Sequence, residues 1–130
     1  MKETIEEFIN QRVWTVLGVS NNTNKFGYKV FKALLDSGYK VYPVNPNCEE
    51  IDGHKCYPDL TSLPEKPEVV NLVIPPSVSE RIVGECAKLK IARVWFQPGA
   101  ESQEATELAE RSGIKVIYNE CAIVERKFWG

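Results

Sequence analysis

The sequence predicts an α/β fold in which a doubly wound, mostly parallel sheet of five strands carries helices on both faces. Three observations lead to this fold class. Five short runs rich in apolar and β-branched residues recur along the chain, as expected of strands buried on both faces. Segments with apolar residues at helical spacing separate these runs. Gly, Pro and Asn mark the turns between them, and strands that alternate with helices form parallel sheets.

The first part of the chain supplies two helices and two strands. Residues 5–11 have apolar side chains at helical spacing, which predicts a short amphipathic helix. Residues 13–17 form a nearly continuous apolar run and are predicted to be the first strand. The second helix carries its apolar face over residues 30–35 and ends at Gly38. Residues 40–44 follow as the second strand.

A polar stretch then interrupts the alternation. Residues 49–67 contain one glycine and three prolines, so we predict a loop there without a long helix. The third strand spans residues 69–74. The helix after it has its apolar face at residues 82–89, and Ser77 or Ser79 is expected to cap its amino end.

The last part of the chain completes the sheet. Residues 93–97 are predicted to be the fourth strand, residues 101–112 the last helix, and residues 115–118 the fifth strand. The three elements follow one another with short turns. We therefore expect residues 1–130 to form a single domain, which is long enough to bury its own core.

Composition and charge exclude several classes of function. The 130 residues carry a formal net charge of −2, whereas a nucleic-acid-binding surface would normally be basic. No window approaches the ~20 apolar residues of a membrane span, and the amino end lacks the apolar core of a signal peptide. We therefore expect a cytoplasmic protein without nucleic-acid or membrane partners. The sequence assigns neither a protein partner nor an oligomeric state.

Residues that could carry catalysis or hold a metal are sparse. The four cysteines, Cys48, Cys56, Cys86 and Cys121, are scattered without a C-x-x-C pair, so we expect free thiols rather than zinc ligands. The single histidine, His54, lies in the polar loop and is expected at the surface. No nucleophile elbow, H-E-x-x-H motif or P-loop occurs. The sequence therefore predicts no catalytic group and no metal site.

The turn after the first strand has the layout of a phosphate-binding turn. Unpaired N–H groups at a helix start carry partial positive charge and attract phosphate. The lysine in this turn can neutralise a phosphate. Two glycines at this spacing do not make the three-glycine dinucleotide fingerprint, so the phosphorylated ligand need not be NAD. The residues expected to form the site are Gly18, Val19, Ser20, Asn21, Lys25, Phe26 and Gly27.

Turn-forming residues also follow the other four strands. In a parallel sheet the carboxyl ends of the strands lie on one edge, where ligands bind at the point of strand-order reversal. An NAD site usually has an acid at the end of the second strand, but the first acid here is Glu49. Asn45 and Pro46 instead offer neutral hydrogen bonds beside an apolar wall, which suits an adenine ring. Because five such turns converge on one edge, we expect them to share a pocket.

Five groups of residues together resemble one protein family. They are Gly18-x-Ser20, Lys25-x-Gly27-Tyr28-x-Val30, Gly38-Tyr39-x-Val41-x-Pro43-Val44-Asn45-Pro46, Trp95-x-Gln97-Pro98-Gly99 and Cys121-x-x-x-Glu125. Over almost its whole length the chain resembles the stand-alone CoA-binding domain proteins. These are similar to the CoA-binding domain of the succinyl-CoA ligase alpha subunit. The resemblance implies a Rossmann-like fold that binds coenzyme A along the carboxyl ends of the strands.

The resemblance also implies a place for each part of the coenzyme. The turn from Gly18 to Gly27 would hold the diphosphate. Few cations lie near the second strand for the 3′-phosphate; Lys40 stands at its start and Lys55 in the loop. The implied contacts are Val44, Asn45 and Pro46 for adenosine, Ile74, Pro75, Pro76, Gln97, Pro98 and Gly99 for pantetheine, and Asn119 and Cys121 at the far rim.

Three functions remain open from the sequence. The leading interpretation is a module that binds CoA or acyl-CoA without chemistry of its own, because the resemblance does not cover the ligase domain that carries the catalytic histidine. The alternatives from the enzyme class are an NAD(P)- or acyl-CoA-using enzyme and a detached subunit of an acyl-CoA synthetase. The third is a redox function, in which Cys121 forms a mixed disulfide with the CoA thiol.

Overall fold

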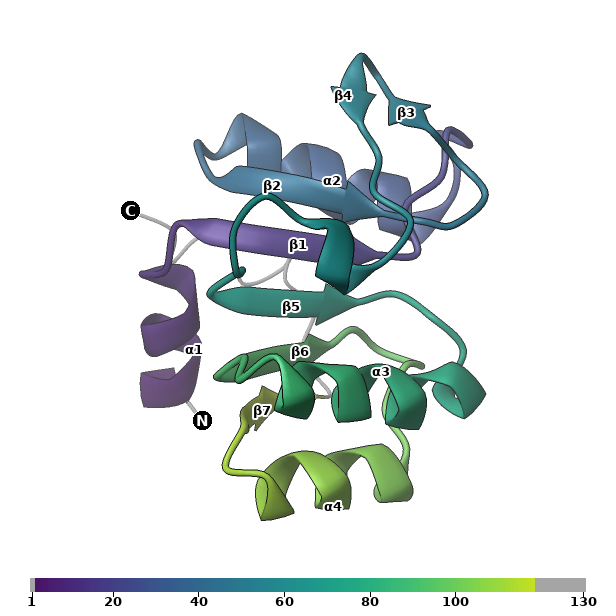
Figure 1. Cartoon of the computed structure of the whole chain (residues 1–130). Coiled ribbons are helices and arrows are strands. Elements are labelled where there is room, and N and C mark those ends of the chain that lie inside the picture. The colour runs from purple at the N-terminus through teal and green to yellow at the C-terminus, as the bar shows by residue number, and fades with distance from the viewer. Residues whose placement is uncertain (1, 119–130) are drawn as a thin grey trace.

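The strands form the predicted parallel sheet. The computed structural model describes residues 2–118, and Figure 1 shows their arrangement. Five strands lie in the order β2-β1-β5-β6-β7, and every neighbouring pair is parallel. Their bounds are β1 (Val13–Leu17), β2 (Lys40–Val44), β5 (Val69–Leu72), β6 (Arg93–Phe96) and β7 (Lys115–Ile117).

Four helices alternate with these strands. Their bounds are α1 (Lys2–Ile9), α2 (Phe26–Asp36), α3 (Pro76–Lys88) and α4 (Gln103–Arg111). The predicted fold class is therefore confirmed, and each predicted helix and strand is present with ends that differ by a few residues. Among the described helices, none has the length and apolar character needed to cross a bilayer.

The strand order reverses between β1 and β5. From β1 the chain adds β2 on one side, and it then crosses over to place β5 on the other side. Hydrogen bonds extend this pairing beyond the strand ends. The N–H of Gly18 donates to the carbonyl of Val44 (3.2 Å), and the N–H of Val73 donates to the carbonyl of Leu17 (2.9 Å). Ligands of open α/β sheets bind at the carboxyl edge beside such a reversal.

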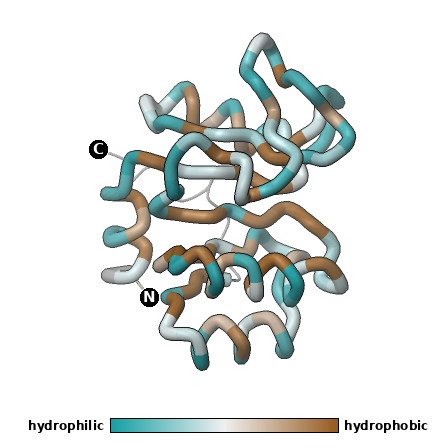
Figure 2. Tube along the Cα trace, in the orientation of Figure 1, coloured by the Kyte–Doolittle hydropathy of each residue, from teal (hydrophilic) through white to brown (hydrophobic). Residues whose placement is uncertain are grey.

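Two apolar layers cover the two faces of the sheet. α1 and α2 pack on one face, where the fully buried rings of Trp14 and Trp95 have centroids 6.1 Å apart. α3 and α4 pack on the other face, against Leu72 and Phe96. Figure 2 colours hydrophobic residues brown, and this colour is most evident along the central strand β5. The large aromatic side chains of Trp14, Trp95 and Phe96 therefore belong to the core.

The segment predicted as a loop contains a hairpin. It has no long helix, as expected, but its residues form an antiparallel pair of strands and a short 3-10 helix that the sequence analysis missed. Asp52 and Gly53 make the hairpin turn, and both have positive φ (48° and 82°). Asp-Gly is a preferred sequence for this kind of turn, so the signal was present. The additional elements are β3 (Glu50–Ile51), β4 (His54–Lys55) and the 3-10 helix η1 (Leu60–Ser62).

The hairpin packs against α2. The hydroxyl of Tyr28 donates to the carboxylate of Asp52 at 2.5 Å, and Lys32 lies 3.5 Å from the same carboxylate. These contacts, the Tyr28 hydrogen bond first, hold the pKa of Asp52 below its ordinary value. The ring of His54 meets that of Phe31 edge-on at 5.7 Å. His54 is exposed on β4, which agrees with its predicted surface position.

The start of α3 differs from the prediction. The helix begins at Pro76, directly after Pro75, and no described side chain caps it. The expected cap by Ser77 or Ser79 was therefore wrong. Ser79 is fully buried, and its hydroxyl donates to the carbonyl of Ala100 at 2.6 Å. Proline suits the first position of a helix because its missing N–H would have no partner there.

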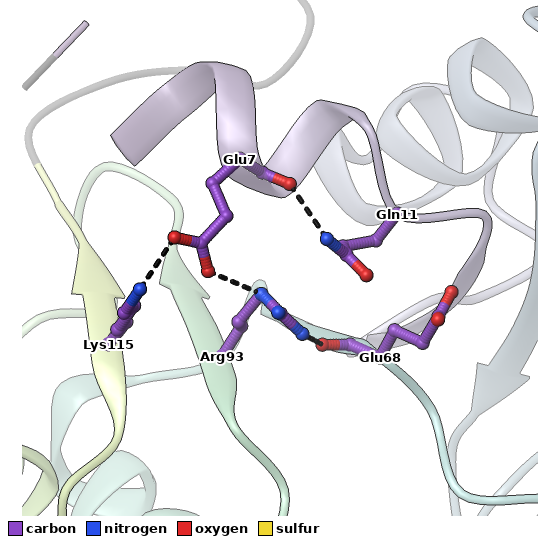
Figure 3. Close-up of polar contacts among 5 residues, drawn as sticks. All are labelled: Glu7, Gln11, Glu68, Arg93 and Lys115. Carbon is purple, nitrogen blue, oxygen red and sulfur yellow. Dashed lines mark hydrogen bonds and ion pairs between the residues drawn. The ribbon is translucent and has the colours of Figure 1, made fainter. Parts of the chain in front are cut away.

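An ion-pair cluster fastens α1 to the amino end of the sheet (Figure 3). The carboxylate of Glu7 accepts hydrogen bonds from Lys115 Nζ (2.6 Å) and Arg93 Nε (2.8 Å). These contacts, that of Lys115 first, hold the pKa of Glu7 below its ordinary value. Arg93 also donates to the carbonyl of Glu68 (3.4 Å), and Gln11 donates to that of Glu7 (3.0 Å). The cluster lies where β6 and β7 begin, on the edge opposite the strand carboxyl ends.

Candidate functional site

Two glycines allow the amino end of α2 to approach the end of β1 closely. Gly18 has a φ of +97°, and a Cβ there would lie 1.9 Å from the carbonyl oxygen of Val73. A Cβ on Gly27 would lie 2.3 Å from the carbonyl oxygen of Gly18. A larger residue at either position would push the backbone segments apart. The glycines of the predicted phosphate-binding turn therefore determine how closely the helix packs on the strand end.

Polar side chains order the turn between these glycines. Ser20 Oγ accepts a hydrogen bond from the N–H of Asn22 (3.2 Å), and Asn22 Oδ1 accepts one from the N–H of Asn24 (3.0 Å). Asn21 Nδ2 donates to the carbonyl of Glu50 (2.9 Å) and so links the turn to the hairpin. The predicted residues Ser20 and Asn21 thus shape the turn through bonds within the protein.

The amino end of α2 is open to an anion. Lys25 is the N-cap residue, with extended backbone (φ −79°, ψ 146°), and no described side chain caps the helix. The first turn contains no acidic residue that would neutralise the positive helix end. Lys25 and Phe26 are both exposed. The free N–H groups and the Lys25 ammonium together favour a phosphate at this position.

Asn45, which was expected to offer hydrogen bonds to a ligand, is engaged within the protein. Its Nδ2 donates to the carbonyl of Val19 (2.7 Å), and its Oδ1 accepts from the N–H of Asn47 (2.8 Å). Its own N–H donates to the carbonyl of Tyr57 (2.9 Å). Asn45 therefore ties the turn after β2 to the turn after β1, which places Pro46 at the edge of the sheet.

A cavity of about 460 Å³ opens at the carboxyl edge of β1 and β2, and we call it the β1–β2 pocket. Its volume lies in the range of small-molecule sites. It brings together six of the predicted residues: Gly18, Val44, Asn45, Pro46, Ile74 and Pro75. The further lining residues are Leu17, Asn47, residues 58–60, and Val78, Arg81, Ile82 and Glu85 of α3.

These further residues form a wall that the sequence analysis did not identify. Asp59 caps the amino end of η1, and its carboxylate accepts hydrogen bonds from the hydroxyl of Thr61 (2.8 Å) and from the N–H (2.9 Å) and hydroxyl (2.6 Å) of Ser62. These bonds, those of Ser62 first, hold the pKa of Asp59 below its ordinary value. Val78 and Ile82 add apolar surface from α3. The Asp-x-x-Ser capping pattern could have revealed η1, but no local signal points α3 towards the pocket.

A smaller cavity of about 250 Å³, the β5–β6 pocket, lies beside the first. Pro98 and Gly99, both predicted site residues, line it together with Val73 and Ala100. Ile74 and Pro75 line both cavities. The two pockets therefore adjoin at the end of β5, next to the strand-order reversal.

Three of the predicted residues contribute differently or cannot be placed. Gln97 is fully buried and donates from Nε2 to Asn71 Oδ1 at 2.8 Å, so it supports the turn after β6 from inside. It is absent from the linings that the described residues give both pockets. Asn71 Nδ2 is buried without a hydrogen-bond partner among the described residues. Asn119 and Cys121 lie outside the described residues, so the contacts expected of them stay predictions.

Cations are few around the two pockets. Lys40 lies at the amino end of β2, where it contacts Glu65 at 2.5 Å. Lys55 is exposed on β4 and is not among the described residues that line the β1–β2 pocket. Arg81 does line that pocket and lies 3.1 Å from Glu85, one helical turn further along α3. Arg81 is therefore the one basic side chain among the described lining residues.

The three described cysteines are free, and two of them are poorly suited to nucleophilic chemistry. Cys48, Cys56 and Cys86 form no disulfide with one another. Burial raises the pKa of Cys86 to about 12, and burial also raises the pKa of Cys56. A thiol needs its thiolate form to act as a nucleophile or metal ligand. Within the part of the chain that the structure describes, no group of His, Cys, Asp and Glu could hold a metal ion.

The fold and the strand-end pockets are typical of α/β domains that bind a ligand at the carboxyl edge of the sheet. Residues 12–127 match the family described as a CoA binding domain, and the chain belongs to this family. The resemblance derived from the sequence motifs is therefore confirmed.

Similar proteins include both ligase subunits and small proteins of this size. The alpha subunit of the ADP-forming acetate–CoA ligase II of Pyrococcus furiosus is 30% identical over 128 residues, which cover 90% of this chain and 28% of that subunit. The chain thus spans less than a third of the length of the acetate–CoA ligases that it matches.

Two solved structures resemble the chain over most of the length of both proteins. A hypothetical protein from Pyrococcus horikoshii has a TM-score of 0.94 at 34% identity, covering 99% of this chain and 92% of that one. A conserved hypothetical protein from Pyrococcus furiosus has a TM-score of 0.84 at 38% identity, covering 88% and 98%. Chains similar to this one therefore occur both as part of longer ligases and as proteins of about this length.

Proposed function

We propose that this chain binds coenzyme A, or an acyl-CoA, at the carboxyl edge of its sheet and has no chemistry of its own. In this proposal the diphosphate binds at the amino end of α2 and adenosine occupies the β1–β2 pocket. The pantetheine arm crosses Ile74 and Pro75 towards the β5–β6 pocket. The observation that carries the proposal is that the two pockets adjoin beside the strand-order reversal, next to the contact between Gly18 and Gly27.

Three further observations favour CoA over a nicotinamide dinucleotide. The amide of Asn45 is engaged with neighbouring backbone groups, so this side chain at the end of β2 is not free to hold a ribose diol. The family to which the chain belongs is described as a CoA binding domain. The lining at Ile74, Pro75 and Pro98 is apolar, which suits the long arm of the coenzyme.

Calorimetric titration with CoA, NAD and ATP tests this proposal. We expect CoA to bind at least about tenfold more tightly than NAD, a difference of roughly 1.4 kcal/mol. The variant Lys25→Ala should weaken CoA binding about three- to tenfold, because it removes a charge beside the helix end. Lys29→Ala, an equally exposed change one turn further along α2, should leave it unchanged. Tighter binding of NAD than of CoA would contradict the assignment of CoA as the ligand. Equal effects of the two variants would contradict the assignment of the diphosphate to the amino end of α2.

A second candidate is an enzyme of the acetate–CoA ligase type. It is favoured by the match of 90% of this chain to the Pyrococcus furiosus ligase subunit. The purified chain can be incubated with acetate, CoA and ATP, and acetyl-CoA measured by chromatography. Formation of acetyl-CoA would support this second candidate and contradict a module without chemistry, whereas CoA binding without product is the result we expect.

A further inference from the structure

The α3 wall of the β1–β2 pocket holds a weakly engaged arginine. Arg81 Nη1 lies 3.1 Å from Glu85 Oε2, and the side chains are 69% and 30% exposed. Exposed ion pairs of this kind contribute little stability, so another anion can replace Glu85 at small cost. The third charged lining residue, Asp59, already accepts hydrogen bonds from Thr61 and Ser62. Arg81 is thus the group in this wall that is able to bind an incoming anion.

The proposed ligand carries a second anionic group, a 3′-phosphate, which the turn before α2 does not bind. CoA bears a phosphate on the 3′-oxygen of its adenosine ribose in addition to the diphosphate. Lys40 lies at the opposite end of β2 and contacts Glu65. Lys55 is not among the described residues lining the pocket. An adenosine in the β1–β2 pocket would therefore present its phosphate to a wall with one basic side chain, that of Arg81.

We infer that Arg81 breaks its ion pair with Glu85 and binds the 3′-phosphate of CoA. The inference rests on the proposed function. The guanidinium group offers paired N–H donors whose geometry matches a phosphate, and such contacts are stronger than those of neutral groups. Glu85 competes for the same donors and repels the phosphate. A ligand without the 3′-phosphate leaves the Arg81–Glu85 pair intact, so this pair gives the pocket its preference for CoA over dephospho-CoA.

Titration of CoA and of dephospho-CoA into the wild type and four variants tests the inference. The wild type should bind CoA more tightly, and Arg81→Gln should reduce this preference about fivefold while its affinity for dephospho-CoA stays the same. Glu85→Gln should increase the preference, because it removes the competitor. Lys88→Gln removes one positive charge from an exposed site on the same helix, outside the described pocket lining, and should leave the preference unchanged.

The outcomes separate this inference from the function on which it rests. An unchanged preference in Arg81→Gln would overturn the inference, as would equal losses in Arg81→Gln and Lys88→Gln, since these would indicate a long-range charge effect. Failure of the wild type to bind CoA would overturn the proposed function itself. Arg81→Lys keeps the charge without the paired donors, so an intermediate preference in that variant supports the contact and a preference equal to that of Arg81→Gln contradicts the role of charge.

Discussion

Alanine substitutions at two helical glycines should change stability in opposite directions. Glycine in a helix costs about 0.5–1 kcal/mol relative to alanine, so a Gly→Ala change stabilises where the space permits it. At Gly84 in α3, an added Cβ would meet no described atom within 4 Å beyond its chain neighbours and the nearby backbone of its own helix. Gly84→Ala should therefore gain about 0.5–1 kcal/mol in the free energy of unfolding.

At Gly27 the contact with the end of β1 makes the same substitution destabilising. An added Cβ would lie 2.3 Å from the carbonyl oxygen of Gly18 and 3.3 Å from Cα of Val19, and ordinary contact begins at 3.4 Å. The backbone at the end of β1 or the start of α2 must therefore move by roughly 1 Å, in a densely packed region. Overpacking of this kind typically costs about 1–3 kcal/mol, which exceeds the gain in helix propensity. The two variants should differ in Tm by roughly 5–15 °C.

Urea unfolding of both variants and the wild type measures these effects, and calorimetry with CoA gives the accompanying affinities. We expect Gly27→Ala to lose stability and CoA affinity together, because the same movement opens the proposed diphosphate site. Gly84→Ala should gain stability with unchanged affinity. If Gly27→Ala proved as stable as Gly84→Ala, the argument from close packing would be refuted. If it were destabilised but bound CoA normally, the diphosphate would have to bind elsewhere.

Three other predictions concern an ion pair, a side-chain amide and a thiol. Because hydrogen bonds, that of Lys115 first, lower the pKa of Glu7 from 4.5, its contribution to stability is present above pH 4.5 and is lost as the pH falls below it. The advantage of the wild type over Glu7→Gln in urea unfolding, about 1 kcal/mol near neutral pH, should therefore shrink in acid, and an advantage that grew would contradict the ion-pair cluster. Asn45→Ala should cost about 1–3 kcal/mol, since it leaves two backbone groups unpaired, and should weaken CoA binding; unchanged stability would show that these bonds contribute nothing. After incubation with oxidised CoA, a module without chemistry should show no adduct in intact mass. The redox alternative would be supported instead by an adduct that Cys48→Ser retains and Cys121→Ser loses, formed when the Cys121 thiolate attacks the disulfide and releases one CoA thiol.

The sequence was sufficient to predict the sheet because each strand is a continuous apolar run. Val13–Leu17 and Val69–Leu72 are covered on both faces, and no helical pattern competes with them. The hairpin was missed because its strands are two residues long, too short for a periodic pattern, although Asp52-Gly53 marks its turn. The capping error at Ser79 had another cause: tertiary packing against Ala100 decided the place of that hydroxyl.

The candidate site was predictable where chain topology determines it. Residues at or just beyond the carboxyl ends of strands, such as Val44 and Ile74, must lie on the carboxyl edge of a parallel sheet. Arg81 was not predictable, because its place in the pocket depends on how α3 packs across the sheet. Gln97 follows a strand as well, yet its side chain turns inward to Asn71, and the sequence alone does not determine which way it points.

A crystal structure of the protein with CoA tests the central claim most directly. The account predicts the diphosphate at the N–H groups near Gly27, the adenine ring in the β1–β2 pocket, and the pantetheine arm over Ile74 and Pro75. CoA bound elsewhere, for example in the shallow cavity that Thr4 and Tyr118 help to line beside α1 and β7, would contradict it. So would a crystal soaked with saturating CoA in which the turn between Gly18 and Gly27 remained empty.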